Sequence, residues 1–202
     1  MNAPSPLILA SASPRRKECL SMLGLTFTVE PADVSEEILP KENPEEYVKR
    51  LACEKALKVA QIRPETVVIG GDTVVLLDND ILGKPDSPED AEDMLLRLSG
   101  RTHTVASGLA IVLPSGEVRS GVATTEVVFR SFKREVARAY VDTEEPFDKA
   151  GAYGIQGLGA VLISEIRGDY YTVVGLPIYL LINLLEECGL EYWFGSIHEA
   201  GL

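Results

Sequence analysis

Three consecutive cations, Arg15, Arg16 and Lys17, follow a Ser13-Pro14 pair at the start of a predicted helix. Serine is a preferred N-cap residue, and proline is favoured at the first position of a helix. The amino end of a helix already carries partial positive charge, so each cation there costs about 0.3–1 kcal/mol. The placement becomes favourable when an anion docks at the helix start, because backbone N–H groups and guanidinium groups then bind it together.

Two further charged residues interrupt apolar patterns. Asp72 lies in the run VVIGGDTVVLL, where an unpaired carboxylate is expensive to bury, although Gly-Gly-Asp is also ordinary turn chemistry. Lys55 falls on the apolar stripe of a helix predicted over residues 43–61, a position that lysine also occupies by extending its ammonium group into water. Taken alone, each pattern favours the ordinary structural interpretation.

Considered together, the charged residues predict an anion site. Lys84 in LGKP and Glu36 in DVSEEILP are each ordinary surface residues in isolation. The cations that we expect to surround an anion such as a polyphosphate are Arg15, Arg16, Lys55 and Lys84. The hydroxyl groups of Ser11 and Ser13 would add donors, and nearby carboxylates would hold Mg²⁺ against the phosphates.

The segment GAYGIQGLG over residues 151–159 is a second unusual stretch. It is neither a GxGxxG dinucleotide fingerprint nor a phosphate-binding P-loop, and its glycines are also explained by turns. Gln156 within it can both donate and accept hydrogen bonds, so it is able to read the polar edge of a ligand. The histidines His103 and His198 lack the spacing of a zinc site.

Alternating patterns predict a mixed α/β fold, formed as one domain over residues 1–202 without a linker. Strands are expected over 6–11, 26–31, 66–77, 104–113 and 118–129. Helices are expected over 14–24, 43–61, 87–100, 133–143 and 177–189. A hairpin is predicted over residues 161–174 with its turn at Gly168-Asp169, and the tail after residue 189 has no clear assignment.

Composition limits the classes of partner. The 202 residues carry a formal net charge of -12, which argues against general binding of nucleic acid or anionic membrane. No run is apolar and long enough for a membrane span, and the first residues lack the basic region of a signal peptide. Three widely spaced cysteines indicate a reducing compartment, so the cytoplasm is the predicted location.

The chain resembles the Maf family of nucleoside triphosphate pyrophosphatases, once described as septum-formation inhibitors. The segments that carry the resemblance are LILASASPRRKECL, VKRLACEKA, VIGGDTVV, LGKP, LSGRTHTV, DKAGAYGIQG and VVGLP. The resemblance implies one elongated domain like that of the inosine triphosphatases, with a curved mixed sheet, flanking helices and a cleft between two lobes. It also implies a divalent cation, Mg²⁺ or Mn²⁺, and a homodimer.

Family positions carry over residue by residue. The phosphate-binding positions match Ser11, Ser13, Arg15, Arg16, Lys55 and Lys84. The resemblance implies that Glu36 and Asp72 are the acidic metal or base positions, with Asp72 usually assigned as the proton acceptor. Arg15, Thr73 and Gln156 stand where the subfamilies differ, and together they look like the branch acting on dTTP and UTP.

Two functions of different classes follow. The first is hydrolysis of dTTP and UTP to the monophosphate and pyrophosphate, which would clear non-standard or excess nucleotides. The alternative is a non-catalytic, nucleotide-binding regulator of cell division or septum formation. A regulator has no need of Asp72 once arginine and lysine hold the phosphates, so the intact acidic set favours the enzyme.

Overall fold

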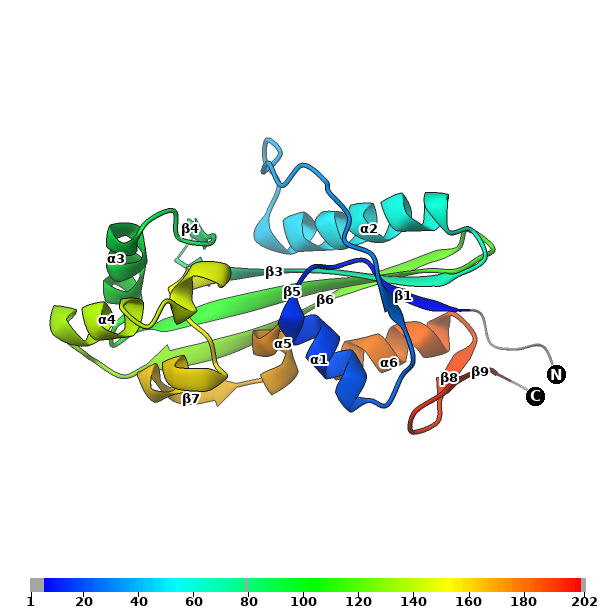
Figure 1. Cartoon of the computed structure of the whole chain (residues 1–202). Helices are drawn as coiled ribbons and strands as arrows, with labels where there is room; N and C mark the ends of the chain where they lie inside the picture. The colour runs from blue at the N-terminus through cyan, green and yellow to red at the C-terminus, as the bar shows by residue number, and fades with distance from the viewer. Residues whose placement is uncertain (1–5, 79, 201–202) are drawn as a thin grey trace. The chain divides into compact units, whose positions relative to one another are not determined.

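The computed structural model of the protein describes residues 6–78 and 80–200 (Figure 1). The chain divides into two compact units. Unit 1 takes its described residues from Met1–Asp72, Ser107–Ala123 and Gly175–Leu202. Unit 2 consists of the described residues of Thr73–Ala106 and Thr124–Val174. The predicted single domain over residues 1–202 stays a prediction.

Among the described residues, seven strands form one mixed sheet in the order β2-β1-β3-β5-β6-β7, with β4 paired to β3. The strands are β1 (Leu7–Leu9), β2 (Thr28–Val29), β3 (Val67–Leu77), β4 (Asp80–Leu82), β5 (Thr102–Val112), β6 (Val118–Phe129) and β7 (Ile163–Arg167). Strand β1 pairs in parallel with β2 and β3, whereas β4 and β7 pair antiparallel with β3 and β6. The predicted α/β class with a mixed sheet is confirmed.

The helices predicted over 14–24, 43–61 and 177–189 lie in unit 1, and each begins within one residue of its predicted start. Its helices are α1 (Pro14–Met22), α2 (Pro44–Ile62) and α6 (Ile178–Glu187). Asn43 caps α2 in a reciprocal capping box with Glu46, which satisfies two backbone N–H groups at once. Helix α2 lies along the sheet (Figure 1), and Ala52, Ala56 and Val59 pack into a buried cluster with β1 and β3.

The Gly70-Gly71 pair lies inside strand β3, so the alternative of a turn at Gly-Gly-Asp is wrong. A Cβ atom at Gly70 would lie 2.2 Å from the Ala52 carbonyl oxygen and 2.9 Å from Ala56 Cβ. Only glycine therefore lets the backbone of α2 approach β3 this closely. A Cβ atom at Gly71 would lie 3.1 Å from Arg16 Nε, so this glycine leaves room for the guanidinium group.

Unit 2 has its own core. Its helices are α3 (Pro88–Leu98), α4 (Arg134–Val141) and α5 (Tyr170–Val174), with 3₁₀ turns η1 (Glu145–Asp148), η2 (Ala150–Ala152) and η3 (Gly157–Leu162). Helices α3 and α4 lie side by side (Figure 1). The core packs Leu95 and Leu98 of α3 and Tyr140 of α4 against Phe129 and Tyr153.

The hairpin predicted over residues 161–174 is wrong. Strand β7 pairs with β6, and the residues after Gly168 form helix α5. The Asp169 carboxylate explains the difference, because it accepts hydrogen bonds from the backbone N–H groups of Tyr171 and Thr172. Such a side-chain cap starts a helix even though the sequence YYTVV is rich in strand-forming residues.

The tail of unit 1 forms a hairpin that the sequence left unassigned. Strands β8 (Leu190–Tyr192) and β9 (Ile197–Glu199) pair antiparallel, and the Tyr192 hydroxyl donates a 2.7 Å hydrogen bond to the Leu23 carbonyl. Over residues 6–78 and 80–200, no helix combines the length and apolar character needed to cross a membrane.

We expect Gly70→Ala to destabilise the protein by about 1–3 kcal/mol or more, because the backbone of α2 must move away from β3. Gly83→Ala is the matched control, since a Cβ atom there meets nothing within 4 Å. Thermal unfolding of both variants measures the effect. Equal melting temperatures would show that α2 does not depend on this close approach.

Candidate functional site

Arg16 is the buried member of the cation cluster at the start of α1. Its side chain leaves the helix, with Nε donating to the Gly175 carbonyl oxygen at 2.8 Å and Nη1 donating to Ser11 Oγ at 3.0 Å. Ser13 is the predicted N-cap, and its backbone N–H also donates to Ser11 Oγ, at 3.2 Å. The loop before α1 is therefore organised around the Ser11 hydroxyl.

Lys55 joins the two predicted acidic residues. Its Nζ atom donates to Asp72 Oδ1 at 2.6 Å and to Glu36 Oε1 at 2.8 Å. The Lys55 residue is only 9% exposed, so the alternative of a side chain extending into water is wrong. Lysine is almost never buried without a partner, and here it has two carboxylates.

The charges of Arg16 belong to the same cluster. Burial lowers the pKa of its guanidinium group, and the negative charges of Asp72 and Glu36 oppose that effect, with Asp72 the stronger of the two. An arginine keeps its proton in proteins, so this site places two cations beside two anions. Tyr47 lies near the same carboxylates, and its pKa is raised to about 12 by burial first and then by Asp72 and Glu36.

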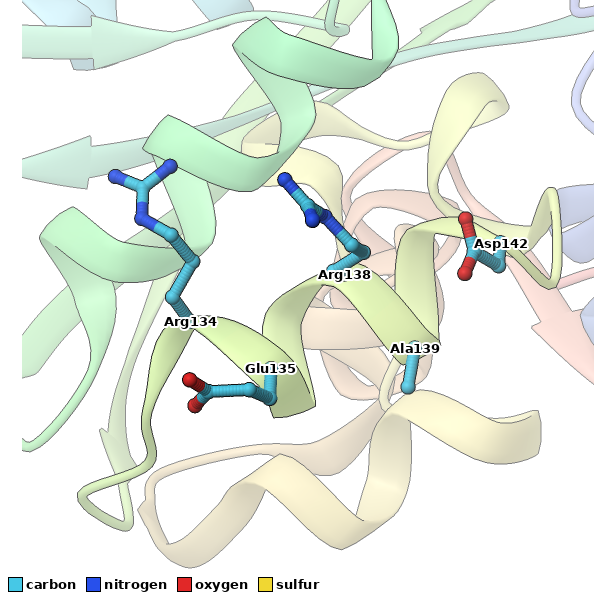
Figure 2. Close-up of a pocket in the computed structure, with 5 residues that line it drawn as sticks. All are labelled: Arg134, Glu135, Arg138, Ala139 and Asp142. Atoms are coloured by element: carbon cyan, nitrogen blue, oxygen red, sulfur yellow. The ribbon is translucent and has the colours of Figure 1, made fainter.

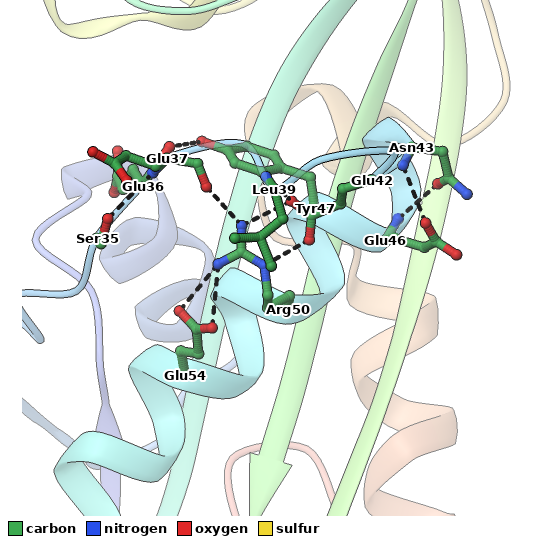
Figure 3. A network of polar contacts seen from close by, with 10 residues as sticks. All are labelled: Ser35, Glu36, Glu37, Leu39, Glu42, Asn43, Glu46, Tyr47, Arg50 and Glu54. Atoms are coloured by element: carbon green, nitrogen blue, oxygen red, sulfur yellow. Dashed lines mark hydrogen bonds and ion pairs between the residues drawn. The ribbon is translucent and has the colours of Figure 1, made fainter.

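Glu36 lies on an irregular segment that polar contacts fasten to α2 (Figure 3). The Tyr47 hydroxyl donates to the Glu36 carbonyl oxygen at 2.8 Å. Arg50 Nη2 donates to the Glu37 carbonyl oxygen at 2.9 Å, and the same guanidinium group binds both carboxylate oxygens of Glu42. These contacts hold the backbone at Glu36 and at the residue that follows it.

The carboxylates suit a hard cation that arrives with its ligand. Mg²⁺ is usually held by one or two carboxylates together with phosphate oxygens and water. Glu36 and Asp72 supply two such carboxylates on either side of one ammonium group. Within the described parts of the chain, no group of three or more His, Cys, Asp or Glu residues gathers to hold a metal. Glu36 and Asp72 are the two carboxylates that would hold such a cation together with phosphate oxygens.

Arg15 is a half-buried residue of α1 in unit 1, and the other three predicted site residues belong to unit 2. Thr73 lies in β3, whereas Lys84 and Gln156 are exposed residues of two loops. These loops are joined by a 2.9 Å hydrogen bond from the Gly151 N–H to the Gly83 carbonyl oxygen. Unit 2 therefore brings the segment of Lys84 next to the start of the glycine-rich segment, residues 151–159, which contains Gln156.

His103 belongs to the core of unit 2. It is 3% exposed, and its Nε2 atom lies 2.7 Å from the Tyr153 hydroxyl. Burial lowers its pKa to about 4, so the ring is neutral near pH 7. The prediction that it is no zinc ligand stays a prediction.

A hollow of about 250 Å³ lies beside α4 of unit 2, lined by Arg134, Glu135, Arg138, Ala139 and Asp142 (Figure 2). It contains no residue that the sequence marked for chemistry. Its two arginines pair with the Glu92 carboxylate of α3. These contacts tie α3 to α4.

Sequence reasoning missed the residues that position the site. Tyr47 and Arg50 lie in the first turns of α2, where no local pattern singles them out. Gly175 contributes only a carbonyl oxygen, which no side-chain pattern reveals. These residues act through contacts with residues that are far away in the sequence. Local sequence patterns therefore cannot reveal them.

The start of α1 presents a buried arginine bonded to a serine hydroxyl, and beside it a lysine pairs with two carboxylates. In an α/β protein, this arrangement defines the class that acts on phosphate anions. Comparison with known proteins identifies the family within this class. The family described as Maf-like protein matches residues 6–188, and the chain belongs to it.

Curated relatives resemble the chain over nearly its whole length. It is 48% identical to the dTTP/UTP pyrophosphatase of Moorella thermoacetica, over 94% of this chain and 98% of the relative. It is 49% identical to that of Clostridioides difficile, over 90% and 94% of the two chains. The Ham1 protein of Staphylococcus aureus, at 16% identity, has a similar fold with a TM-score of 0.53, over 90% of this chain and 98% of that one.

The contacts of Arg16 revise one expectation from the sequence. A merely misplaced cation could be removed without loss of stability, but Arg16 is buried and bonds to Ser11 and Gly175. We expect Arg16→Ala to lower the stability of the ligand-free protein by about 1–3 kcal/mol. Lys17→Ala is the control, because Lys17 is an exposed cation of the same helical turn. Thermal melts without ligand compare them, and equal melting temperatures would contradict a structural role for Arg16.

Proposed function

We propose that this protein is a nucleoside triphosphate pyrophosphatase that hydrolyses dTTP and UTP to the monophosphate and pyrophosphate. The observation that carries the proposal is the Lys55 ammonium group between Glu36 and Asp72, with Arg16 in the same electrostatic cluster. Support also comes from relatives named dTTP/UTP pyrophosphatase at 48% and 49% identity.

Charge neutralisation is the first requirement of this reaction. A triphosphate brings several negative charges close to the attacking water, so positioning and electrostatics supply most of the catalysis. Arg16 and Lys55 are buried cations of unit 1, and the proposal assigns them to the phosphates. The start of α1 adds backbone N–H groups beside Ser11 and Ser13.

Asp72 is the proposed proton acceptor. Water attacks the α phosphorus, the bond from that phosphorus to the bridging oxygen breaks, and pyrophosphate leaves with the bond's electron pair. The Asp72 carboxylate takes the proton that the water loses. Lys55 holds one oxygen of that carboxylate at 2.6 Å, which fixes the orientation of the other.

Glu36 and Asp72 are also the proposed holders of a divalent cation, Mg²⁺ or Mn²⁺. When bound with the nucleotide, such an ion neutralises phosphate charge and so favours departure of pyrophosphate. Lys55 then serves as the fixed partner that keeps the two carboxylates together before the nucleotide arrives.

Base selection falls to the residues at which the subfamilies differ. Thymine and uracil share an acceptor–donor–acceptor edge, and the amide of Gln156 matches part of it. Arg15 and Thr73 occupy the other two positions, and Lys84 is the further cation proposed for the phosphates. We also propose a cytoplasmic location, in accord with the free thiols of Cys19, Cys53 and Cys188. The homodimer is proposed from the family resemblance alone.

The first test removes the charge of Asp72. We expect Asp72→Asn to lower pyrophosphate release by about 10²–10⁴-fold while nucleotide binding survives, because the cations remain. Asp78→Asn is the matched control, since Asp78 is an exposed residue that pairs with Arg101. Near wild-type turnover of the Asp72 variant would reject its catalytic role. A wild-type protein that binds nucleotide but releases no pyrophosphate would instead support the non-catalytic regulator.

The second test concerns the base. We expect the wild-type protein to hydrolyse dTTP and UTP well, and ATP, GTP and 7-methyl-GTP poorly. Gln156→Glu should reduce kcat/KM for dTTP by on the order of 10²-fold, and much more than for any purine, because one donor to the base is lost. Gln61→Glu, at an exposed position of α2, controls for added charge. Equal losses on every nucleotide would remove Gln156 from base recognition.

A further inference from the structure

Glu145 and Tyr140 hold the two ends of the segment that carries Gln156. Glu145 Oε2 accepts a hydrogen bond from the Leu158 N–H at 2.9 Å, and Oε1 accepts one from the Gly159 N–H at 3.0 Å. The Tyr140 hydroxyl donates to Glu145 Oε1 at 2.8 Å and accepts from the Gly154 N–H at 3.1 Å. Gln156 lies midway between the backbone groups held in this way.

The environment of these two side chains makes the contacts strong. Tyr140 is 6% exposed within the core of unit 2, so its ring cannot shift without loss of packing. Burial alone would raise the pKa of Glu145, but the hydrogen bonds from Leu158, Gly159 and Tyr140 outweigh it and lower that pKa. The carboxylate is therefore ionised at neutral pH, and hydrogen bonds to a charged acceptor are stronger than neutral ones.

The glycines of this segment fit closely around the two side chains. Gly157 has a φ of +72°, and a Cβ atom there would lie 2.7 Å from Glu145 Oε2. A Cβ atom at Gly159 would lie 2.5 Å from the Tyr140 hydroxyl oxygen. Both positions therefore require glycine so that the backbone can reach its acceptors. The backbone of the segment is therefore hydrogen-bonded on both sides of Gln156.

We propose that Glu145 and Tyr140 are positioning residues for base selection, which hold residues 154–159 so that the Gln156 amide meets the pyrimidine edge. This inference rests on the proposed function, because it assigns the purpose of the contacts from the role of Gln156. Neither residue touches the substrate in this account. Their effect passes through the backbone of Gly154, Leu158 and Gly159.

The test compares Glu145→Gln and Tyr140→Phe with Glu92→Gln. The Glu145 change keeps the size of the side chain and removes its charge. Glu92→Gln is the control, since it removes the charge of a different carboxylate of unit 2, a buried one that pairs with Arg134 and Arg138. The preference is measured as the ratio of kcat/KM for dTTP to kcat/KM for GTP, alongside the melting temperature.

We expect Glu145→Gln and Tyr140→Phe to lower this preference by roughly 10- to 100-fold, mainly through a higher KM for dTTP. Glu92→Gln should lower only the melting temperature. The double variant of Glu145 and Tyr140 should lose little more than either single variant, because both act on one segment. Hydrogen–deuterium exchange of residues 154–159 should accelerate in the Glu145 and Tyr140 variants and stay unchanged in Glu92→Gln.

The outcomes separate this inference from the proposed function. A wild-type preference for dTTP that persists in both variants while exchange accelerates would overturn the positioning role and leave the proposed function intact. Equal losses on dTTP and GTP would make the two residues merely structural and likewise overturn it. A wild-type protein without preference would overturn the proposed base selection itself, and this inference with it.

Discussion

The arrangement of unit 1 depends on the two ion pairs that Lys55 makes with the carboxylates of Glu36 and Asp72. An ammonium group that is almost fully buried needs anionic partners, and Glu36 and Asp72 come from separate segments of the chain. Asp72 sits in strand β3, and Lys55 sits in helix α2, so helix and strand must lie close together. Gly70 permits this approach because its missing side chain leaves space for the Ala52 carbonyl oxygen. The position of Glu36 depends in turn on Tyr47 and Arg50, which fasten its segment to the same helix.

The two units support their functional residues by different means. In unit 1, charged side chains contact one another directly, so each orients its neighbour. In unit 2, the exposed Gln156 depends on neighbouring backbone N–H groups, which donate hydrogen bonds to the Glu145 carboxylate and the Tyr140 hydroxyl. Both arrangements are preorganised, because the conformational entropy of these groups is lost when the protein folds rather than when a ligand binds.

Local patterns predicted most of the fold, because caps and periodicity are properties of neighbouring residues. Ser13 and Asn43 marked the starts of α1 and α2 correctly. Asp169 misled, since its role as a helix cap outweighed the strand propensity of the residues that follow. For the site, the apolar stripe singled out Lys55 but could not name its partners. Lys55 and Glu36 are 19 residues apart, and only the tertiary fold brings them together. Only the family resemblance pointed to Thr73, and the roles of Thr73, Lys84 and Gln156 stay predictions.

The balanced charges around Lys55 also affect how an anion reaches the protein. Arg16 and Lys55 offset Asp72 and Glu36, so this cluster contributes almost no net field at a distance. The rest of the chain gives a formal net charge of -12, which repels an approaching nucleotide. Dissolved salt screens that repulsion over about 10 Å at 0.1 M ionic strength, whereas contacts inside the cluster are screened much less. Moderate salt therefore speeds the encounter with an anion, the reverse of the behaviour of a basic nucleotide-binding protein.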